Sequence, residues 1–237
     1  MSRKTRPSQA LLMEVYERLL AGQGPRHWWP AESPFEVITG AILTQNTAWR
    51  NVPPALERMK AAGLWSFDRI LAAETQALVE AIRPAGYHNT KARKLKEFAA
   101  VVVREFDGEL DKLFALDTPV LRERLLGVWG IGDETADDIV LYAANKPSFV
   151  IDKYTVRIVD RLGWRVNGSK YRDYQRLFTS LLPVDVPLWN EYHALLDGHA
   201  ARVCRSKPVC ESCCLLDICP TGKRSLHQTR GAQAGVP

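Results

Sequence analysis

The sequence predicts an all-α protein of about ten helices. Apolar residues recur at helical spacing in successive segments along nearly all of the 237 residues. No segment shows the sustained alternation of apolar and polar residues that a half-buried strand requires. Short connections separate the segments, and most carry a helix cap or a helix breaker. These three observations favour helices packed against helices over any sheet architecture.

Caps and breakers define the individual elements. Gly22 ends the first segment, Ser66 precedes a short one, and Gly63 ends a segment that carries prolines in its first turn. The segment 89–106 is a long amphipathic helix with a basic first half. The expected helices span residues 8–22, 34–45, 52–63, 66–73, 74–82, 89–106, 117–127, 133–145, 152–164, 169–182 and 186–204.

The composition is that of an ordinary globular protein, with 46% hydrophobic and 25% charged residues. The net charge of +5 favours polyanionic partners, and it is equally consistent with a solubilising surface. The first twenty residues lack the apolar stretch and cleavage site of a secretory signal. No apolar run approaches the roughly 20 residues of a membrane span. We therefore expect a soluble cytoplasmic protein without a membrane partner.

All five cysteines lie between Cys204 and Cys219. Cys204, Cys210, Cys213 and Cys219 have the spacing C-x5-C-x2-C-x5-C, and Cys214 is an alternative to Cys213. In a reducing compartment, clustered cysteines indicate metal ligation rather than disulfides. Zinc sites usually use two short knuckles, whereas this loop has one, so an iron–sulfur cluster is favoured over zinc.

A glycine hairpin lies within the stretch "LLGVWGIGDETADDIV". Gly130 and Gly132 flank the apolar Ile131, and a new helix is expected to begin near Asp133. Glycines without a Cβ let a phosphate approach the backbone N–H groups, and the following helix N-terminus favours an anion. The hairpin therefore predicts contact with a DNA backbone. A plain helix–helix connection is the alternative.

In their order and spacing, these motifs resemble the endonuclease III superfamily of DNA glycosylases. The similar stretches are "GAILTQNTAW", "AGYHNTKARKL", "GVWGIGDETAD", "VIDKYTVRIVDRLG" and the cysteine loop. The resemblance implies two helical domains, with DNA between them and the target base flipped into a pocket. It also implies a 4Fe–4S cluster. The expected parts are 1–30, which joins the C-terminal cluster domain, the helical barrel 31–148, the C-terminal helices and cluster loop 149–220, and a disordered tail 221–237.

The sequence departs from the family pattern at two places. The first cysteine spacer is one residue shorter than the usual C-x6-C. In the hairpin, lyase-active members resemble "GVGRKTA", and Glu134 stands at the position of their lysine. A carboxylate cannot form a Schiff base, so we expect no strand cleavage through that position.

Asp152 matches the catalytic aspartate of the family, which would stabilise positive charge on the sugar and activate water. Its place before a helix also predicts a plain N-cap. Lys153 follows it and is expected to contact a phosphate or to lie on the surface. A lyase amine at this displaced position is a further alternative. The resemblance places Gln45 near the space that the flipped base vacates, and Tyr87 at a wedge position. A buried glutamine and a packed tyrosine are the alternatives.

Trp28, Trp29 and Trp49 flank the expected pocket and resemble the 3-methyladenine branch of the superfamily. Alkylated purines carry positive charge, which aromatic faces attract, and they leave readily. Core packing is the alternative for these tryptophans.

The prediction is a monofunctional glycosylase that removes alkylated purines from double-stranded DNA and acts as a monomer. A glycosylase for damaged or mismatched pyrimidines is one alternative. A catalytically inactive DNA-binding iron–sulfur protein is another. Either a DNA groove or a solvated helix face is the expected environment of four basic side chains, Lys91, Arg93, Lys94 and Lys96.

Overall fold

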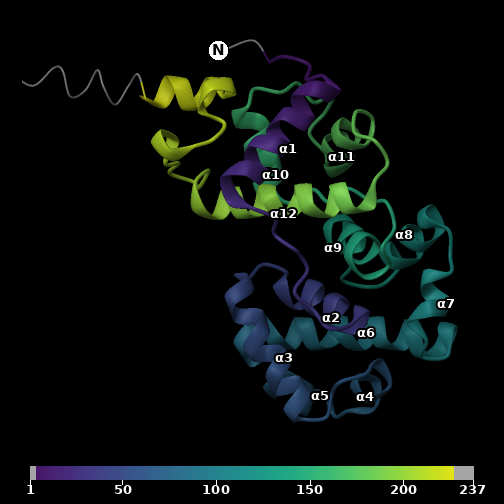
Figure 1. Ribbon diagram of the computed structural model, residues 1–237. Coiled ribbons are helices and arrows are strands. Elements are labelled where there is room, and N and C mark those ends of the chain that lie inside the picture. The colour runs from purple at the N-terminus through teal and green to yellow at the C-terminus, as the bar shows by residue number, and fades with distance from the viewer. Residues whose placement is uncertain (1–3, 227–237) are drawn as a thin grey trace, which may run out of the picture. The chain divides into compact units, whose positions relative to one another are not determined.

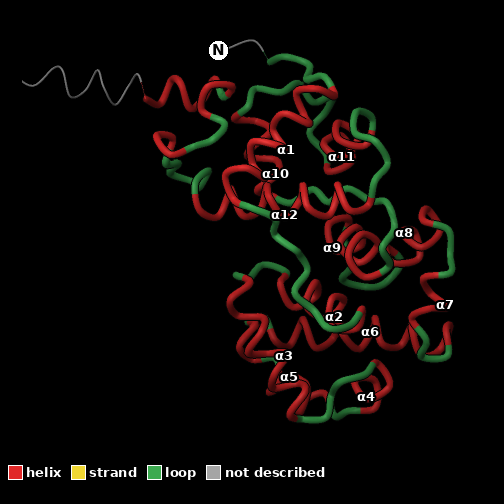
Figure 2. The backbone as a smooth tube through the Cα atoms, in the orientation of Figure 1, coloured by secondary structure: helices red, strands yellow, loops and turns green. Residues whose placement is uncertain are grey.

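The computed structural model describes residues 4–226, and these form helices joined by loops (Figures 1 and 2). Within this range the only β-type pairing is an isolated parallel bridge between Thr5 and Trp164. The prediction of an all-α protein is therefore confirmed. No helix in the described range is long and apolar enough to cross a membrane.

The chain folds into two compact units. One unit holds the described residues up to Trp28 together with those from Phe149 onward, and the other spans Trp29–Ser148. The two ends of the chain therefore fold together, and the middle of the chain folds as a separate unit.

The middle unit is built around α2 (Pro34–Thr44), whose residues from Val37 to Leu43 are all buried. The long α6 (His88–Phe106) packs against α2, α4 and α5. The other helices of this unit are α3 (Val52–Ala61), α4 (Phe67–Ala72), α5 (Thr75–Ala81), α7 (Leu110–Phe114), α8 (Thr118–Leu126) and α9 (Asp133–Asp138). The sequence analysis missed α7, because five residues are too few to show a helical period.

The expected helix 133–145 is α-helical only in its first part, α9. After α9, residues Ile139–Ala143 form a π-helical turn, in which the N–H of Ala144 donates to the carbonyl of Ile139 at 2.9 Å. Such turns are rare and frequently lie at functional sites. This turn packs against α2.

The unit formed by the chain ends holds α1 (Gln9–Gln23), α10 (Lys153–Arg161), α11 (Tyr171–Thr179) and α12 (Val186–Arg202). Its core is aromatic. Phe149 and Phe178 stack with ring centroids 4.2 Å apart, and Tyr192 packs edge-on against both. The buried Tyr192 hydroxyl donates to the Leu12 carbonyl at 2.8 Å and so joins α12 to α1.

The structure differs from the expectation of disorder beyond Thr221. Residues 220–226 are helical, and the N–H of Lys223 donates to the carbonyl of Cys219 at 3.1 Å. The cysteine loop supplies the first turn of this helix, a tertiary constraint that composition does not reveal. The remainder of the expected tail, 227–237, lies outside the described residues.

Three lysines in the basic half of α6 bond to the protein itself. The Lys91 ammonium donates to the carbonyls of Leu43 and Ala85, at 2.7 and 2.9 Å, and Lys96 donates to those of Leu71 and Ala73. These carbonyls lie at or near the ends of α2, α4 and a short 3₁₀ turn, where cations are favourable. The third, Lys94, donates to a side-chain amide near the hairpin. Lys91 is only 2% exposed, so its side chain lies neither in a DNA groove nor on a solvated helix face.

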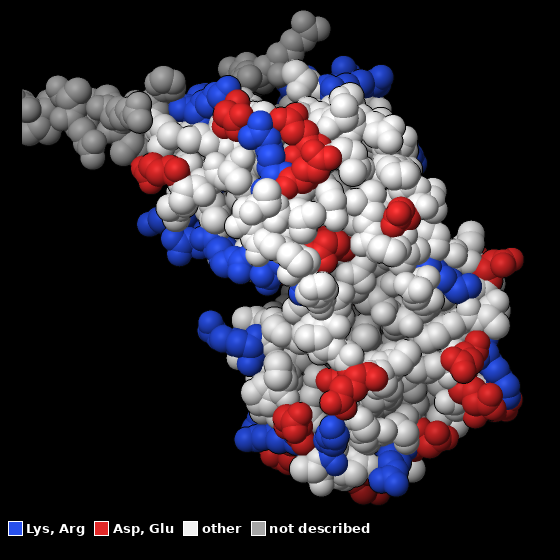
Figure 3. Space-filling view, in the orientation of Figure 1, with Lys and Arg blue, Asp and Glu red and all other residues white. Residues whose placement is uncertain are grey.

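Charged side chains of both signs are interspersed on the face where α1 lies (Figure 3). Along the edge near the C-terminal end of α12, Lys and Arg side chains gather without acidic ones in the same view (Figure 3). Binding of a polyanion therefore depends on individual basic residues and their contacts.

The buried Lys91 predicts a dependence of stability on pH. Burial, assisted by the charge of Lys94, lowers the pKa of Lys91 to about 8, against 10.5 in the unfolded chain. Between these pH values the unfolded state binds more protons than the folded state, so the free energy of unfolding gains a contribution that rises with pH. Urea unfolding at pH 7.5, 8.5 and 9.5 should show the wild type gaining stability relative to Lys91→Met. A difference that is constant with pH would show that Lys91 stays charged when folded.

Candidate active site

Asp152 lies at the N-terminus of α10, directly after the buried segment 149–151. Its Oδ1 accepts the backbone N–H of Thr155 at 2.6 Å, and the residue is 8% exposed. Asp152 is therefore an N-cap, and the cap uses one of its two oxygens. Among residues 4–226, no donor is within hydrogen-bonding distance of Oδ2, so this oxygen is available to another molecule.

A second carboxylate, Asp197 on α12, interacts electrostatically with Asp152. Burial is the main cause that raises the pKa of Asp197, and the charge of Asp152 raises it further. His193, Arg26 and Lys153 act in the opposite direction. The sequence analysis missed Asp197, because only the packing of α10 on α12 brings it close to Asp152.

The hairpin between α8 and α9 uses its two glycines differently. Gly130 has a left-handed backbone with φ of 87°, and a Cβ there would lie 2.5 Å from Cγ of Lys94. Gly132 has an ordinary φ of −101°, and a Cβ there would meet no atom within 4 Å. Ile131 between them is buried. Gly130 is therefore required by the fold, whereas Gly132 borders open space.

Gln45 lies behind this hairpin. Its Nε2 donates to Oγ1 of Thr135 at 2.8 Å and to the carbonyl of Gly130 at 3.2 Å, and its Oε1 accepts from the Lys94 ammonium. The amide therefore bonds to the protein through both its nitrogen and its oxygen. This geometry favours a structural role for the half-buried Gln45 over a group that faces DNA.

Tyr87 is 68% exposed at the N-cap position of α6, with a left-handed backbone (φ 47°, ψ 32°). This conformation is uncommon for a bulky residue. The packed alternative is therefore wrong for Tyr87. Lys153 is also exposed, with its ammonium 5.2 Å from the ring centroid of Tyr154.

Trp29 is the centre of an aromatic cluster in the middle unit. Its ring centroid lies 5.2 Å from that of Trp49 and 5.5 Å from that of Tyr142, both edge-on. A Cβ on Gly40 would lie 3.3 Å from the Trp29 ring, so this glycine lets the indole lie against α2. Tyr142 was missed, because the π-helical turn that presents it has no sequence signal. Trp28 belongs to the other unit.

Four cysteines, Cys204, Cys210, Cys213 and Cys219, line a single cavity. Cys214 does not line it, and its Sγ lies 3.5 Å from the position of a Cβ on Gly22. Within residues 4–226, no three His, Cys, Asp or Glu side chains are close enough together to hold one metal ion. Four thiols spread around a cavity suit a multinuclear cluster better than a zinc ion, which needs every sulfur at about 2.3 Å.

Several donors surround the sulfurs. Arg161 donates to Sγ of Cys204 at 3.2 Å, and the N–H of Gly222 donates to Sγ of Cys219 at 3.3 Å. The ring nitrogen Nε2 of His199 lies 3.5 Å from Sγ of Cys213. Burial raises the pKa of Cys213 to about 11. The Cys213 thiol therefore becomes a thiolate more readily when a cation is bound, and N–H groups near the sulfurs would stabilise sulfur charge.

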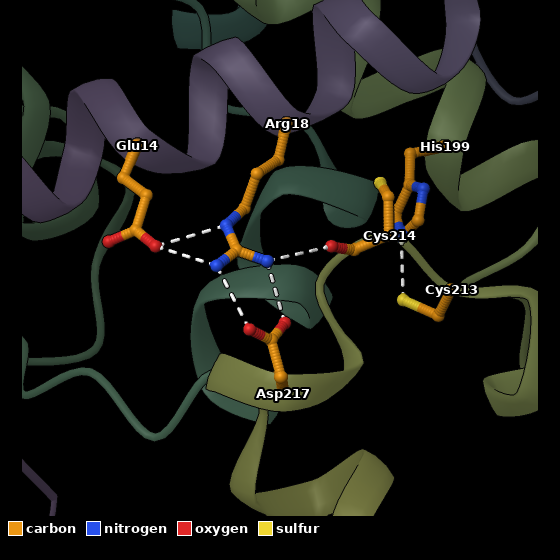
Figure 4. Close-up of polar contacts among 6 residues, drawn as sticks. All are labelled: Glu14, Arg18, His199, Cys213, Cys214 and Asp217. Atoms are coloured by element: carbon orange, nitrogen blue, oxygen red, sulfur yellow. Dashed lines mark hydrogen bonds and ion pairs between the residues drawn. The ribbon is translucent and has the colours of Figure 1, made fainter.

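Arg18 of α1 holds the cysteine loop (Figure 4). Its guanidinium donates to both oxygens of Asp217, at 2.6 and 2.9 Å, and to the carbonyl of Cys214 at 3.3 Å. Glu14, one turn earlier on α1, accepts from the same guanidinium at 2.8 Å. Arg18 has no sequence signal for this role, because it lies 196 residues from Cys214 along the chain.

Comparison with known proteins supports the fold and the family. Residues 39–184 match the model of the family described as HhH-GPD superfamily base excision DNA repair protein. A putative DNA repair glycosylase of Methanocaldococcus jannaschii is 40% identical over 88% of this chain and 96% of its own. An endonuclease III–DNA complex has a TM-score of 0.80 at 20% identity, covering 93% of this chain and 99% of that one.

A further similar structure is the 3-methyladenine DNA glycosylase of H. pylori bound to 1,N6-ethenoadenine. Its TM-score is 0.72 at 26% identity, and the match covers 83% of this chain and 98% of the other. The present chain therefore belongs to the HhH-GPD superfamily of base excision DNA repair glycosylases. The resemblance seen in the sequence is confirmed.

The two hairpin glycines give a matched pair of variants. Gly130→Ala should lower the free energy of unfolding by about 1–3 kcal/mol, because it combines a strained backbone with a clash against Lys94. Gly132→Ala should change it by no more than about 0.5 kcal/mol. Urea denaturation of both variants measures the difference. Equal effects would contradict the distinction drawn between the two glycines.

Proposed function

We propose that this glycosylase is monofunctional and hydrolyses the N-glycosidic bond of alkylated purines, such as 3-methyladenine, in double-stranded DNA. The observation that carries the proposal is the carboxylate of Asp152, which is largely buried and has one oxygen fixed by a cap and the other without a donor among the described residues. As the base departs, positive charge builds on the sugar. A fixed carboxylate stabilises that charge and activates the attacking water.

The absence of a lyase step rests on Glu134. It is exposed near the start of α9, at the position that resembles the lysine of lyase-active members. A carboxylate has no amine with which to attack the sugar, so the abasic product is left intact.

The alkylpurine preference rests on the aromatic cluster of Trp29, Trp49 and Tyr142. All three rings are half-buried, and aromatic faces attract a cationic base, so these rings together with Trp28 would bind the base. The similarity to a 3-methyladenine glycosylase supports this choice. Release of damaged pyrimidines is the competing specificity, and the test below separates the two.

We propose that Cys204, Cys210, Cys213 and Cys219 hold a 4Fe–4S cluster. When bound, the cluster would supply rigidity to the loop 204–219 rather than a chemical step. The hydrogen bonds of Arg161 and Gly222 would stabilise its sulfur ligands.

We expect the protein to act as a monomer on double-stranded DNA in the cytoplasm, at the nucleoid if the cell is prokaryotic. The hairpin glycines Gly130 and Gly132 would approach a phosphate. Tyr87 would enter the duplex where the base has left, and Lys153 would contact the backbone.

The test of the activity uses duplex DNA methylated at random, with released bases identified by chromatography. The wild type should release 3-methyladenine, and Asp152→Asn should lower the rate by at least about 100-fold, since it keeps the cap and removes the charge. Asp185→Asn is the matched control, because Asp185 caps α12 in the same way, accepting from the N–H of Leu188 at 2.8 Å. The control should retain full activity.

Three outcomes would contradict parts of this proposal. Release of uracil, thymine or oxidised thymine from matching oligonucleotides, without alkylpurine release, would replace the substrate assignment. No release of any base by protein with its cluster intact would favour the inactive DNA-binding alternative. Full activity in Asp152→Asn would exclude this carboxylate as the catalytic group.

The cysteine assignment is tested by metal content. Cys213→Ser should lose most of the bound iron and the visible absorption of a cluster, because Cys213 lines the cavity. Cys214→Ser should retain both, because Cys214 packs near Gly22 instead. Elemental analysis of purified protein gives the iron and zinc content of each variant. Zinc in place of iron, or loss of iron in Cys214→Ser, would overturn the assignment.

A further inference from the structure

The hairpin of this protein has an unusual charge for a DNA contact. Its sequence "GIGDETA" places Asp133 and Glu134 where the lyase-active pattern "GVGRKTA" has two basic residues. Arg122 offsets Asp133 through an ion pair of 2.7 Å. Glu134 is an exposed acidic residue beside the glycines. A phosphate that approaches this hairpin therefore needs positive charge from another element.

Arg93 on α6 provides such a charge beside the hairpin. Its guanidinium carbon lies 3.8 Å from the ring centroid of Trp129, the residue directly before Gly130. Trp129 is 44% exposed, which sets it apart from the buried aromatic rings of the middle unit's core. The guanidinium therefore lies over the indole, next to the start of the hairpin.

Stacking leaves the hydrogen-bonding edge of Arg93 available. A guanidinium packs on an aromatic ring through its flat face, and its N–H groups point outward in the plane of the group. Arg93 also makes a weak pairing of Nε with Glu97 at 3.6 Å, between side chains that are 60% and 45% exposed. Within the described residues its terminal nitrogens have no hydrogen-bond partner.

The neighbouring Lys94 plays a different part. Its stem passes under Gly130, and its ammonium donates to Gln45, so it supports the hairpin from behind. The two adjacent basic residues of α6 therefore have different roles. Lys94 holds the loop, and Arg93 is left to meet a ligand.

We propose that Arg93, stacked on Trp129, is a DNA-phosphate contact that replaces the basic residues missing from the hairpin itself. The inference rests on the proposed function, because it assumes that the hairpin faces DNA. Trp129 acts as a platform that fixes the guanidinium, which lowers the conformational entropy lost when the phosphate binds. The bonding partner is a backbone phosphate, so this contact is independent of base sequence.

The experiment measures binding of the full-length protein to an undamaged labelled duplex by fluorescence anisotropy over a range of salt concentrations. Arg93→Ala should weaken binding by about fivefold near 0.1 M salt and should reduce the slope of log K against log salt by about one. Trp129→Ala should weaken binding less, by about twofold, with the slope unchanged, because the charge remains. Arg93→Lys should keep the slope and also bind more weakly than the wild type.

The matched control is Arg104→Ala. Arg104 is an exposed arginine further along α6, and its side chain has no ion pair or hydrogen bond among the described residues. This variant should bind as the wild type does.

Other outcomes separate this proposal from the function on which it rests. If Gly132→Val weakens duplex binding and Arg93→Ala does not, the hairpin binds DNA without Arg93, and only the present proposal is overturned. If Arg93→Ala and Arg104→Ala lower the affinity and the slope equally, Arg93 has no special place, and the proposal fails. If the wild type does not bind duplex DNA at any salt concentration, the proposed function fails together with this inference.

Discussion

The bond between Lys94 and Gln45 is the interaction on which the middle unit's candidate site depends. Gln45 holds the carbonyl of Gly130 and the hydroxyl of Thr135, and Lys94 fixes the orientation of that amide while its stem fills the space beneath Gly130. The three elements α2, α6 and α9 therefore meet behind one turn. A hairpin supported in this way keeps its backbone N–H groups in place before any phosphate arrives, which reduces the cost of binding.

The basic side chains in the first half of α6 are of two kinds, those that hydrogen-bond to the protein's own oxygens and one that does not. Lys91, Lys94 and Lys96 satisfy carbonyl or amide oxygens of the protein, whereas Arg93 rests on an aromatic face and keeps its donors. A helix end without a donor is costly, so Lys91 and Lys96 stabilise the fold through the carbonyls that they contact, and Lys94 stabilises it through Gln45. The number of basic residues on this helix is therefore larger than the number available to bind DNA. The proposed contact depends on the one of these four basic side chains that does not serve the fold.

In the unit formed by the chain ends, basic side chains likewise hold a loop in place, here the cysteine loop. Arg18 and Arg161 hold the cysteine loop through carbonyls and through Asp217, so the positions of the thiols are set by α1 and α10. Asp152 begins the same α10 that Arg161 ends. The cluster proposed for this loop and the proposed catalytic carboxylate are thus attached to one short helix. Stiffening the loop would also restrain the helix that carries Asp152.

Most of the helices, the hairpin glycines, the cysteine spacing and the cap at Asp152 were predictable from the chain, because periodicity, caps and spacing are local properties. The five-residue α7 and the helix at 220–226 were not. What each polar side chain contacts depends on how the helices pack against one another. Gln45 and Gly130 are 85 residues apart, and Arg18 and Cys214 are 196 apart. The place of Cys213 rather than Cys214 at the cavity, the burial of Lys91 and the approach of Asp197 to Asp152 all follow from such distant contacts. Residue type and spacing do not encode them, because they arise only when separate helices pack.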